Sequence, residues 1–311
     1  MPSSSEIRQS TDAILMIRPH RFYPNPETAV DNAFQKPIAQ GEMPAVSAAA
    51  RVEFDAAVET LRAAGVTVHV VEDTASPEKP DAVFPNNWIS THHDGRVAIY
   101  PMFSEARRRE RRHDVIDELR QHYRVSGVVD YSACEEKGQC LEGTGSLVLD
   151  HANKLAYASI SHRTHPEVLD RFCADFGYEA VKFHSASEDG RAVYHTNVVL
   201  CIASEFAMIG LGMIADEAER VGVQNLLEAT GKEVIELEPN QIAEFAGNAI
   251  ELHNEREKLL VLSARAAAAL TNAQRTAVER YARLSPLNLP TIELAGGSAR
   301  CMIATIHLPR L

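Results

Sequence analysis

The sequence contains few cysteines, and no two of them form a CxxC pair. Five cysteines are spread over 311 residues, and no HExxH motif is present. Neighbouring His92 and His93 cannot both face one side of a strand. We therefore expect no metal site. An odd, sparse cysteine count favours a reducing compartment, so we also expect a cytoplasmic protein with free thiols.

Positive charge is also scarce. Thirty-one Lys and Arg against 43 Asp and Glu give a formal net charge of −12, which disfavours nucleic acid and anionic membranes as partners. The first residues, "MPSSSEIRQSTD", lack the basic and apolar regions of a signal peptide. The apolar run at 198–214 is interrupted by Ser204 and Glu205, short of a membrane span. Neither GxGxxG nor a P-loop occurs, so we expect no nucleotide and no other cofactor.

No low-complexity linker follows residue 12, which predicts a flexible tail over 1–12 and a single domain over 13–311. Five segments show helical periodicity, each preceded by a strand or hairpin and followed by a short β-rich run. In the third, Pro166 stands near the start and Gly177 at the end, as helix termini prefer. The β-rich runs are 66–72, 125–131, 178–183, 233–238 and 291–294. The predicted fold class is α/β, built from five ββαβ units.

A regular spacing of polar residues supports five repeats. Glu142, His195, Asn248 and Cys301 stand 53 residues apart, each at the head of a predicted hairpin, and a further step back reaches "FPNNW". A fixed period of this length indicates a repeat architecture. We expect the last strand, in "CMIATIHL", to pair with the repeat that contains "AILMIRP". The ring would then close with pseudo-fivefold symmetry, and the hairpin heads would converge on its axis.

The converging side chains suffice for nucleophilic catalysis. A Cys301 thiolate can attack, His195 can move protons, and Glu142 can orient the imidazole. Cysteines are most often core residues, and Cys173 and Cys201 have that character. The equal spacing of Cys301, His195 and Glu142 favours the catalytic interpretation. His20, His92, His93 and His113 are expected in solvent.

These motifs resemble the guanidino-group-modifying enzymes of the pentein superfamily, which have a five-bladed α/β-propeller fold. The matching stretches are "PDAVFPNNW", "LEGTGSLVLD", "SHRTH", "YHTNVVL" and "GGSARCM", in that order. Together with the repeat they cover nearly the whole chain. Within the superfamily the chain looks most similar to the citrulline-utilisation hydrolases.

The resemblance implies a role for individual residues. Cys301 would be the nucleophile, His195 the proton shuttle and Glu142 the residue that holds the imidazole. Asp81 would bind the nitrogen end of the substrate, and Arg163 its carboxylate. The "RRRERRH" stretch reads as the charged start of a helix, from which Arg108 (or Arg107) would assist.

The chain departs from the deiminase pattern at two positions. Deiminases usually carry an aspartate where this chain has Asn87, and many carry His-x-Asp where "HTN" places Asn197. Aspartates bind a cationic guanidinium by charge-assisted bonds, whereas an amide offers both donors and an acceptor, as a ureido group requires. Asn87 and Asn197 therefore favour citrulline, or an arginine dihydrolase, although Asn87 could simply support the "PNN" turn.

We therefore expect a cysteine-dependent hydrolase that cleaves C–N bonds of a small ureido or guanidino amino acid. Citrulline would yield ornithine, ammonia and carbon dioxide. The alternatives are an arginine deiminase, a dimethylarginine dimethylaminohydrolase or an amidinotransferase, although the last usually needs longer loops to exclude water. A pentein-fold binding protein without catalysis is the alternative of another class. The sequence leaves open whether the chain forms a homo-oligomer.

Overall fold

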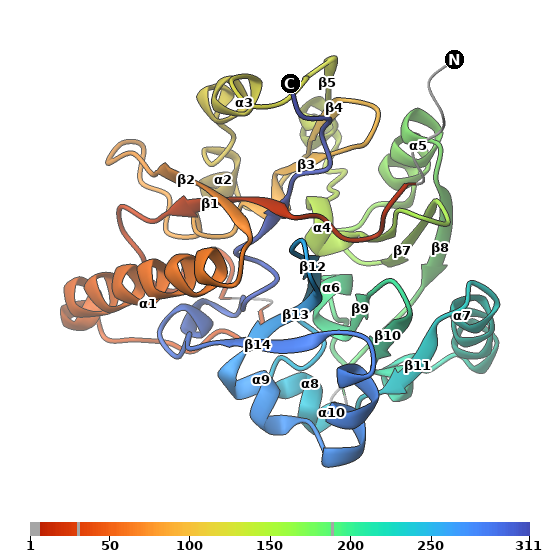
Figure 1. Cartoon of the computed structure of the whole chain (residues 1–311). Helices are drawn as coiled ribbons and strands as arrows, with labels where there is room; N and C mark the ends of the chain where they lie inside the picture. Colours follow the sequence, from red (N-terminus) through yellow and green to blue (C-terminus); the bar gives the residue numbers. More distant parts are fainter. Residues whose placement is uncertain (1–6, 30–31, 188–189) are drawn as a thin grey trace.

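The computed structural model describes residues 7–29, 32–187 and 190–311. These residues form five three-stranded sheets arranged around the middle of the molecule, with helices α1, α3, α5, α7 and α10 at its outside (Figure 1). In the described part of the chain, no helix is both long and apolar enough to cross a membrane.

Each sheet combines one antiparallel and one parallel strand pair. In the second sheet, β3 (Ile89–Thr91) pairs antiparallel with β4 (Arg96–Ile99), and β4 pairs parallel with β5 (Gly127–Asp130). Three further sheets repeat this order: β6 (Val148–Asp150), β7 (Leu155–Ser159) and β8 (Glu179–Phe183); β9 (Leu200–Ile202), β10 (Phe206–Ile209) and β11 (Glu233–Glu236); β12 (Ile250–His253), β13 (Lys258–Ser263) and β14 (Arg283–Leu287). The repeated strand order matches the predicted unit.

The first sheet joins the two ends of the chain. Strand β15 (Ala304–Thr305) runs antiparallel to β1 (Ala13–Arg18), and β1 runs parallel to β2 (Thr67–Glu72). Ile14 lies opposite Thr305, and Leu15 opposite Ala304. The predicted pairing of the last strand with the amino-terminal strand is confirmed.

A helical segment connects the parallel strands of each sheet. These segments are α1 (Met43–Ala63), α3 (His113–Arg120), α5 (Pro166–Phe176), α7 (Glu217–Ala229) and the pair α9 (Ala264–Ala269) and α10 (Asn272–Glu279). Helix α5 starts at Pro166, and Gly177 ends it in the left-handed region at φ 69°, as its terminal residues predict. Shorter helices are α2 (Glu105–Arg108), α4 (Gly143–Ser146), α6 (Thr196–Val199) and α8 (Pro239–Ala243).

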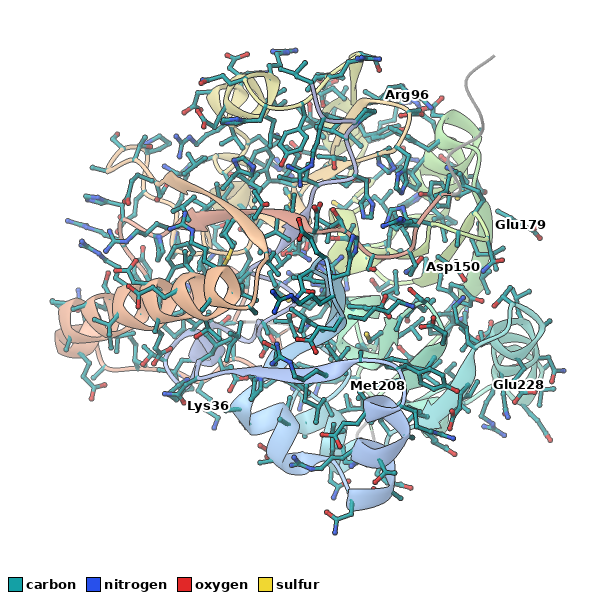
Figure 2. The ribbon with its side chains drawn as sticks, in the orientation of Figure 1. Lys36, Arg96, Asp150, Glu179, Met208 and Glu228 are labelled. Atoms are coloured by element: carbon teal, nitrogen blue, oxygen red, sulfur yellow. The ribbon has the colours of Figure 1, made fainter. Side chains whose placement is uncertain are left out.

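The buried apolar side chains lie between the sheets and the helices. Met208 of β10 is fully buried, whereas Glu179 and Glu228 point outward from the periphery (Figure 2). Some charged residues inside the protein form ion pairs: the carboxylate of buried Asp150 lies 3.2 Å from Lys232 Nζ. Pairing is what makes such burial tolerable.

The prediction of a strand at 291–294 is wrong. Residues Ile292–Ala295 form a 3₁₀ turn, and the third strand of this sheet is the earlier segment β14. The Glu53 carboxylate accepts hydrogen bonds from the backbone N–H groups of Thr291 and Ile292. The carboxylate thus pairs the free N–H groups at the start of the turn, as a capping side chain does at a helix start. Strand β14 was not predicted because it contains Pro286, and proline lacks the backbone N–H of a regular strand residue. An edge strand such as β14 tolerates this.

The flexible tail expected over 1–12 stays a prediction. Residues 1–6 lie outside the described part, and residues 9–12 contact the rest of the protein. The Gln9 side chain donates hydrogen bonds to the carbonyls of Leu149 and Ile202. Buried Thr11 donates one to the Ile306 carbonyl at 2.6 Å. Residues 9–12 are therefore anchored by side-chain bonds that a composition argument does not reveal.

Candidate active site

The residues spaced 53 apart lie where the chain enters its hairpins. Glu142 directly precedes α4 and His195 directly precedes α6. Asn248 lies in the turn before β12, and Cys301 in the turn before β15. All four are buried. Glu142, His195, Asn248 and Cys301 are linked into two groups, a carboxylate–imidazole pair and an amide–thiol pair.

The carboxylate–imidazole pair is closely bonded. His195 Nε2 lies 2.6 Å from Glu142 Oε2. The other carboxylate oxygen accepts a hydrogen bond from the Phe103 backbone N–H at 2.9 Å. Arg163 Nη1 lies 3.4 Å from Glu142 Oε2. The carboxylate is therefore fixed from several sides, and in turn it fixes the imidazole.

The thiol of Cys301 lies next to two amide groups. Asn248 Nδ2 is 3.3 Å and Asn197 Nδ2 is 3.5 Å from Cys301 Sγ. Asn248 Nδ2 also donates to the Asn197 carbonyl, and Asn248 Oδ1 accepts from the Arg300 backbone N–H. Two N–H groups aimed at one sulfur stabilise negative charge on it.

A small cavity of about 30 Å³ connects the two groups. Among its lining residues are six expected at the site or next to it: Cys301, His195, Asp81, Asn87, Arg163 and Arg107. The other described residues that line it are Thr28, Asn32, Phe84, Tyr194, Val198, Ala295, Gly296 and Gly297. Residues from distant parts of the chain thus share one enclosed space with a thiol and an imidazole.

The end of the cavity near Asp81 contains a buried charge network. Asn25 Nδ2 donates to Asp81 Oδ2 at 2.8 Å, and Arg107 Nε lies 3.7 Å from the same oxygen. Arg107 also forms two bonds of 2.9 Å to Glu110. Its Nη1 donates to Asn87 Oδ1 at 2.8 Å. Arg107 therefore connects two carboxylates with the Asn87 amide.

The structure places Arg108 outside the cavity, which corrects the expectation for this residue. Its Nε donates to the Met102 carbonyl and lies 3.3 Å from Glu135 Oε2. Arg107 faces the cavity instead. Neighbouring residues on a helical turn point in directions about 100° apart, so only one of the two arginines can face inward.

Arg163 and Asn197 were also expected to contact the substrate, and the structure shows which protein groups they contact. Arg163 is almost fully buried, and its guanidinium lies 4.1 Å from the centre of the Tyr194 ring, in addition to its contact with Glu142. Asn197 points its amide at Cys301 and is not part of the cavity wall. A role of Arg163 in carboxylate binding stays a prediction.

Burial and charge shift the pKa values of the ionisable groups. Burial lowers the pKa of His195 below its usual range, although Glu142 opposes the shift. Burial acts to raise the pKa of Glu142, but the positive charge of Arg163 and the bond from His195 hold it far below its usual range. Burial raises the pKa of Asp81 against the attraction of Arg107. At neutral pH we therefore expect a neutral imidazole beside an ionised Glu142.

Glycine allows the close approach of the side chains at α4. A Cβ at Gly145 would lie 2.2 Å from Asn87 Nδ2 and 3.0 Å from His195 Nδ1. A Cβ at Gly143, which has φ +45°, would lie 2.3 Å from the Asn86 carbonyl oxygen. The two glycines of "EGTG" are therefore required, because a larger residue would collide with Asn86, Asn87 or His195.

Comparison with known proteins identifies the family. The model of the family described as N,N dimethylarginine dimethylhydrolase, eukaryotic, matches residues 18–308. The chain belongs to this family. It is thus a member of the pentein superfamily, as the motifs predicted. A search among curated protein sequences found no match.

Solved structures of the superfamily share the fold of this dimethylarginine dimethylhydrolase family member. The N-terminal domain of ArgZ, an arginine dihydrolase from the ornithine–ammonia cycle in cyanobacteria, is 16% identical, with a TM-score of 0.74 over 96% of this chain and 99% of that domain. AgrE bound to L-arginine gives the same TM-score and identity, and the match covers 40% of its longer chain. A dimethylarginine dimethylaminohydrolase adduct with S-methyl-L-thiocitrulline is 15% identical, with a TM-score of 0.63 over 96% of this chain and 99% of that one.

Sequence reasoning missed several residues of the site in this family member. Arg107 was considered but not preferred, Asn25 lies in no motif, and Tyr194 lies in "YHTNVVL" but was given no role. Asn248 was recognised as a hairpin head without a role, although its position in the 53-residue period was a usable signal. Its contact with Cys301 depends on how two sheets meet, which the spacing does not specify.

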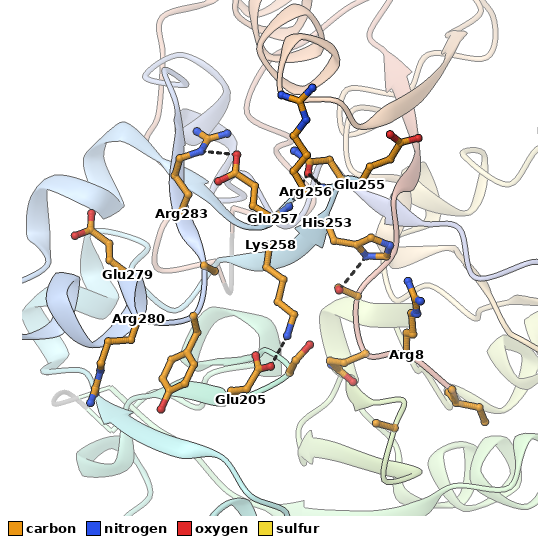
Figure 3. Close-up of a pocket in the computed structure, with 18 of the residues that line it drawn as sticks. Arg8, Glu205, His253, Glu255, Arg256, Glu257, Lys258, Glu279, Arg280 and Arg283 are labelled. Atoms are coloured by element: carbon orange, nitrogen blue, oxygen red, sulfur yellow. Dashed lines mark hydrogen bonds and ion pairs between the residues drawn. The ribbon is translucent and has the colours of Figure 1, made fainter. Parts of the chain in front are cut away.

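A much larger hollow lies elsewhere and lacks catalytic character. It has a volume of about 1470 Å³, and its wall carries charged residues of both signs, including Arg8, Glu205, Lys258 and Arg283. Several of these charges pair with one another, as Arg283 does with Glu257 at 2.9 Å (Figure 3). Cys301 and His195 are not among its lining residues. Size alone therefore does not mark the reactive site.

Proposed function

We propose that this protein is a cysteine-dependent hydrolase that cleaves C–N bonds of a ureido or guanidino amino acid. Citrulline, or arginine processed as by a dihydrolase, is the preferred substrate. The supporting observation is the cavity in which Cys301, the His195–Glu142 pair, Asp81 and Asn87 meet. The membership in a family of guanidino-group hydrolases agrees with this chemistry.

The proposed reaction needs only the residues of the cavity and water. The Cys301 thiolate attacks the central carbon of the ureido or guanidino group, and a nitrogen leaves as its bond to that carbon breaks. His195, which has taken up the proton of the Cys301 thiol, protonates the departing nitrogen and then takes a proton from the water that hydrolyses the thio-linked intermediate. From citrulline and one water the products are ornithine, ammonia and carbon dioxide. Arginine needs two waters and releases a second ammonia.

The contact between His195 and Glu142 assigns the two ring nitrogens. Nε2 is bonded to the Glu142 carboxylate, which leaves Nδ1 as the nitrogen that exchanges protons with substrate and water. Glu142 remains ionised and stabilises the imidazolium that forms during turnover. The two amides at Cys301 Sγ stabilise the attacking thiolate.

The orientation of the Asn87 amide determines which of its atoms a substrate could meet. Arginine only donates hydrogen bonds, so the Asn87 atom facing Arg107 Nη1 is the acceptor Oδ1. The donor Nδ2 must then point the other way, toward Gly145 and the Glu142 carbonyl. The second Nδ2 hydrogen is the one that a ureido oxygen would have to meet, whereas a carboxylate at this position offers only acceptors.

The family model favours N,N-dimethylarginine as a second candidate substrate. Its guanidinium is cationic, and in the cavity the carboxylate of Asp81 would bind it. The same cysteine chemistry would then release dimethylamine and leave citrulline. The two candidates differ in the charge that the nitrogen end of the cavity must accept, and therefore in the role of Asn87.

We extend the proposal to the architecture. The five sheets act as blades of a pentein-type propeller with pseudo-fivefold symmetry, and residues 13–311 form a single catalytic domain. The supporting observations are the identical strand order of the five sheets and the pairing of β15 with β1.

The proposal is tested by assaying the purified protein with citrulline, arginine, N,N-dimethylarginine and agmatine, with ornithine, citrulline and ammonia as readouts. We expect ornithine from citrulline or arginine, and none from Cys301→Ser. Asn87→Asp should favour arginine over citrulline by tenfold or more, because a mismatched buried polar contact costs about 1–3 kcal/mol. Asn272→Asp, an exposed change at the start of α10, is the matched control.

Three results would contradict the proposal in different ways. Turnover of dimethylarginine alone would select the second candidate. An unchanged product ratio in active Asn87→Asp would remove Asn87 from substrate selection. Substrate binding without turnover would favour a non-catalytic binding protein.

A further inference from the structure

A cluster of three histidines lies apart from the Cys301 cavity. His93 stands in the turn between β3 and β4, His151 directly follows β6, and His307 follows β15. One ring nitrogen of each lies within 4.8 Å of the others. The ring centres of His151 and His307 are 4.0 Å apart, and those of His93 and His307 4.7 Å. Three sheets thus bring one imidazole each to the same place.

The expectation that the histidines near 92 lie in solvent is wrong for His92. It is 2% exposed and its ring lies 4.0 Å from that of Phe176. Its Nε2 is bonded to Ser90. His92 therefore packs against Phe176 beside the cluster, while its neighbour His93 reaches His307.

Two of the three imidazoles use one nitrogen for an outer hydrogen bond. His151 Nδ1 lies 2.8 Å from the Tyr178 hydroxyl. His93 Nε2 lies 3.2 Å from the Arg8 carbonyl oxygen. In each ring the second nitrogen remains for the shared space. Histidines that bind metals have this pattern, because a hydroxyl or carbonyl on the outer nitrogen orients the ring.

The third imidazole carries a buried nitrogen without a partner. His307 is 6% exposed, and among the described residues its Nδ1 has no hydrogen-bond partner. A buried polar atom left unpaired lowers stability. An ion bound among the three rings offers His307 the interaction that its protein neighbours do not.

The cluster borders two hollows whose walls carry charged residues of both signs. A hollow of about 300 Å³ is lined by His93 and His307. A second one, of about 40 Å³, is lined by His151, His307, Glu251 and Arg300. The Glu251 carboxylate accepts hydrogen bonds from the backbone N–H and the hydroxyl of Ser204, and the imidazoles add no charge when neutral.

We propose that His93, His151 and His307 bind a divalent transition-metal ion of the zinc type. Zinc binds imidazole nitrogens at about 2.0–2.1 Å, which places tetrahedral ligand atoms about 3.3 Å apart. On binding, the nitrogens would therefore approach one another, while the rings of His151 and His307, whose centres are 4.0 Å apart, would turn away from each other. Water takes the fourth position. This proposal is independent of the proposed function and replaces the expectation of no metal. Sequence motifs could not indicate the site, since its ligands lie in three distant segments.

The position of the site assigns the ion a structural role. His307 belongs to the segment that follows β15, which pairs with β1, while His93 and His151 belong to the second and third sheets. One ion would link these three sheets. Cys301 and His195 line a different cavity. We therefore expect the ion to stabilise the fold without taking part in turnover.

The test is metal binding by the whole protein after removal of metals with a chelator. Titration with CoCl₂ should give one equivalent with visible ligand-field bands and no thiolate charge-transfer band, and ZnCl₂ should displace the cobalt. ZnCl₂ should also raise the midpoint of thermal unfolding. His93→Ala, at a partly exposed ring, and His307→Gln should each weaken cobalt binding at least tenfold.

Two control variants distinguish this site from others. His122→Ala disrupts a surface group of His69, Glu118 and His122, whose ligand atoms also lie within 4.8 Å of one another. Cys301→Ser removes the reactive thiol. Both should bind cobalt within about twofold of the unmodified protein. Circular dichroism confirms that each variant is folded.

The outcome that overturns the proposal is equally specific. Cobalt binding that disappears in His122→Ala or Cys301→Ser but persists in folded His93→Ala would place the metal elsewhere. Failure of the unmodified protein to bind a full equivalent at about tenfold excess of CoCl₂ would also refute it.

Discussion

Glu142 is the residue on which the contacts of the site converge. Its carboxylate meets His195, Arg163 and the Phe103 backbone, and its backbone N–H donates to Ser146 Oγ at 3.0 Å. The side chain is fully buried and ionised, because positive groups hold its pKa far below the usual range despite burial. The charge of this one residue therefore influences the protonation of its neighbour His195.

Glu142→Gln should lower kcat by about 100-fold or more, because the imidazolium formed during turnover loses its counter-charge. It should also change the pH profile. The Glu142 carboxylate raises the pKa of His195, so its removal lowers that pKa further. The free enzyme needs neutral His195, so the acid limb of kcat/KM should move to lower pH. The measurement is kcat/KM against pH for both proteins.

A limb that moves to higher pH, or that does not move while kcat falls, would contradict this assignment of His195. Circular dichroism and thermal unfolding serve as controls, since Glu142→Gln also weakens the contact with Arg163. A folded variant with unchanged kcat would show that the pair is not catalytic.

At the scale of elements, the short helix α4 positions the site more than any long helix does. It starts immediately after Glu142, and its Ser146 hydroxyl accepts from the Glu142 N–H and donates to the Arg163 carbonyl. Its two glycines leave room for Asn87 and His195. The helix thus holds the charged pair and the Asn87 amide in place together.

Gly145→Ala should reduce kcat/KM by about 100-fold or more while the protein stays folded. The added Cβ would meet two side chains, Asn87 Nδ2 at 2.2 Å and His195 Nδ1 at 3.0 Å, and both must move. A displacement of about 1 Å in a catalytic group is enough for such a loss. Steady-state kinetics with the best substrate provide the measurement.

Gly222→Ala is the matched control for this change. Gly222 lies in α7, and its added Cβ would meet no atom within 4 Å. Alanine should stabilise that helix by about 1 kcal/mol and leave the kinetics unchanged. Near-normal activity of Gly145→Ala would mean that the contact with His195 and Asn87 has no catalytic importance.

At the scale of the whole molecule, stability depends on how the carboxyl-terminal segment is held. Besides the pairing of β15 with β1, Thr91 of β3 connects this segment to the second sheet. Its hydroxyl donates to the Thr305 carbonyl at 3.0 Å and accepts from the His307 N–H at 2.7 Å. One buried hydroxyl thus joins two sheets.

Thr91→Val should lower the free energy of unfolding by about 1–3 kcal/mol, because the nearly isosteric change leaves two buried backbone groups without their partner. Chemical denaturation in the presence of a chelator measures this difference without a contribution from metal. Thr60→Val is the control, since the Thr60 hydroxyl donates to the Ala56 carbonyl on an exposed helix surface. Equal effects of the two changes would argue against a special role of Thr91.

Much of this architecture follows from local sequence features. The helices follow from apolar residues three and four apart and from terminal residues such as Pro166 and Gly177, whose preferences are local. Cys301, His195 and Glu142 follow from the period of 53 residues, because equal positions in repeated units occupy equivalent places. The sequence therefore determined the repeat, the pairing of its ends and the residues that carry the proposed chemistry.

Other features depended on contacts between sheets. Arg107 and Arg108 are adjacent and chemically identical, and only packing decides that Arg107 faces the cavity. The 291–294 segment is a turn because Glu53, far away in the chain, caps it. His93, His151 and His307 form a cluster because three sheets meet there. Such outcomes depend on which distant groups approach one another, and only the tertiary structure decides that.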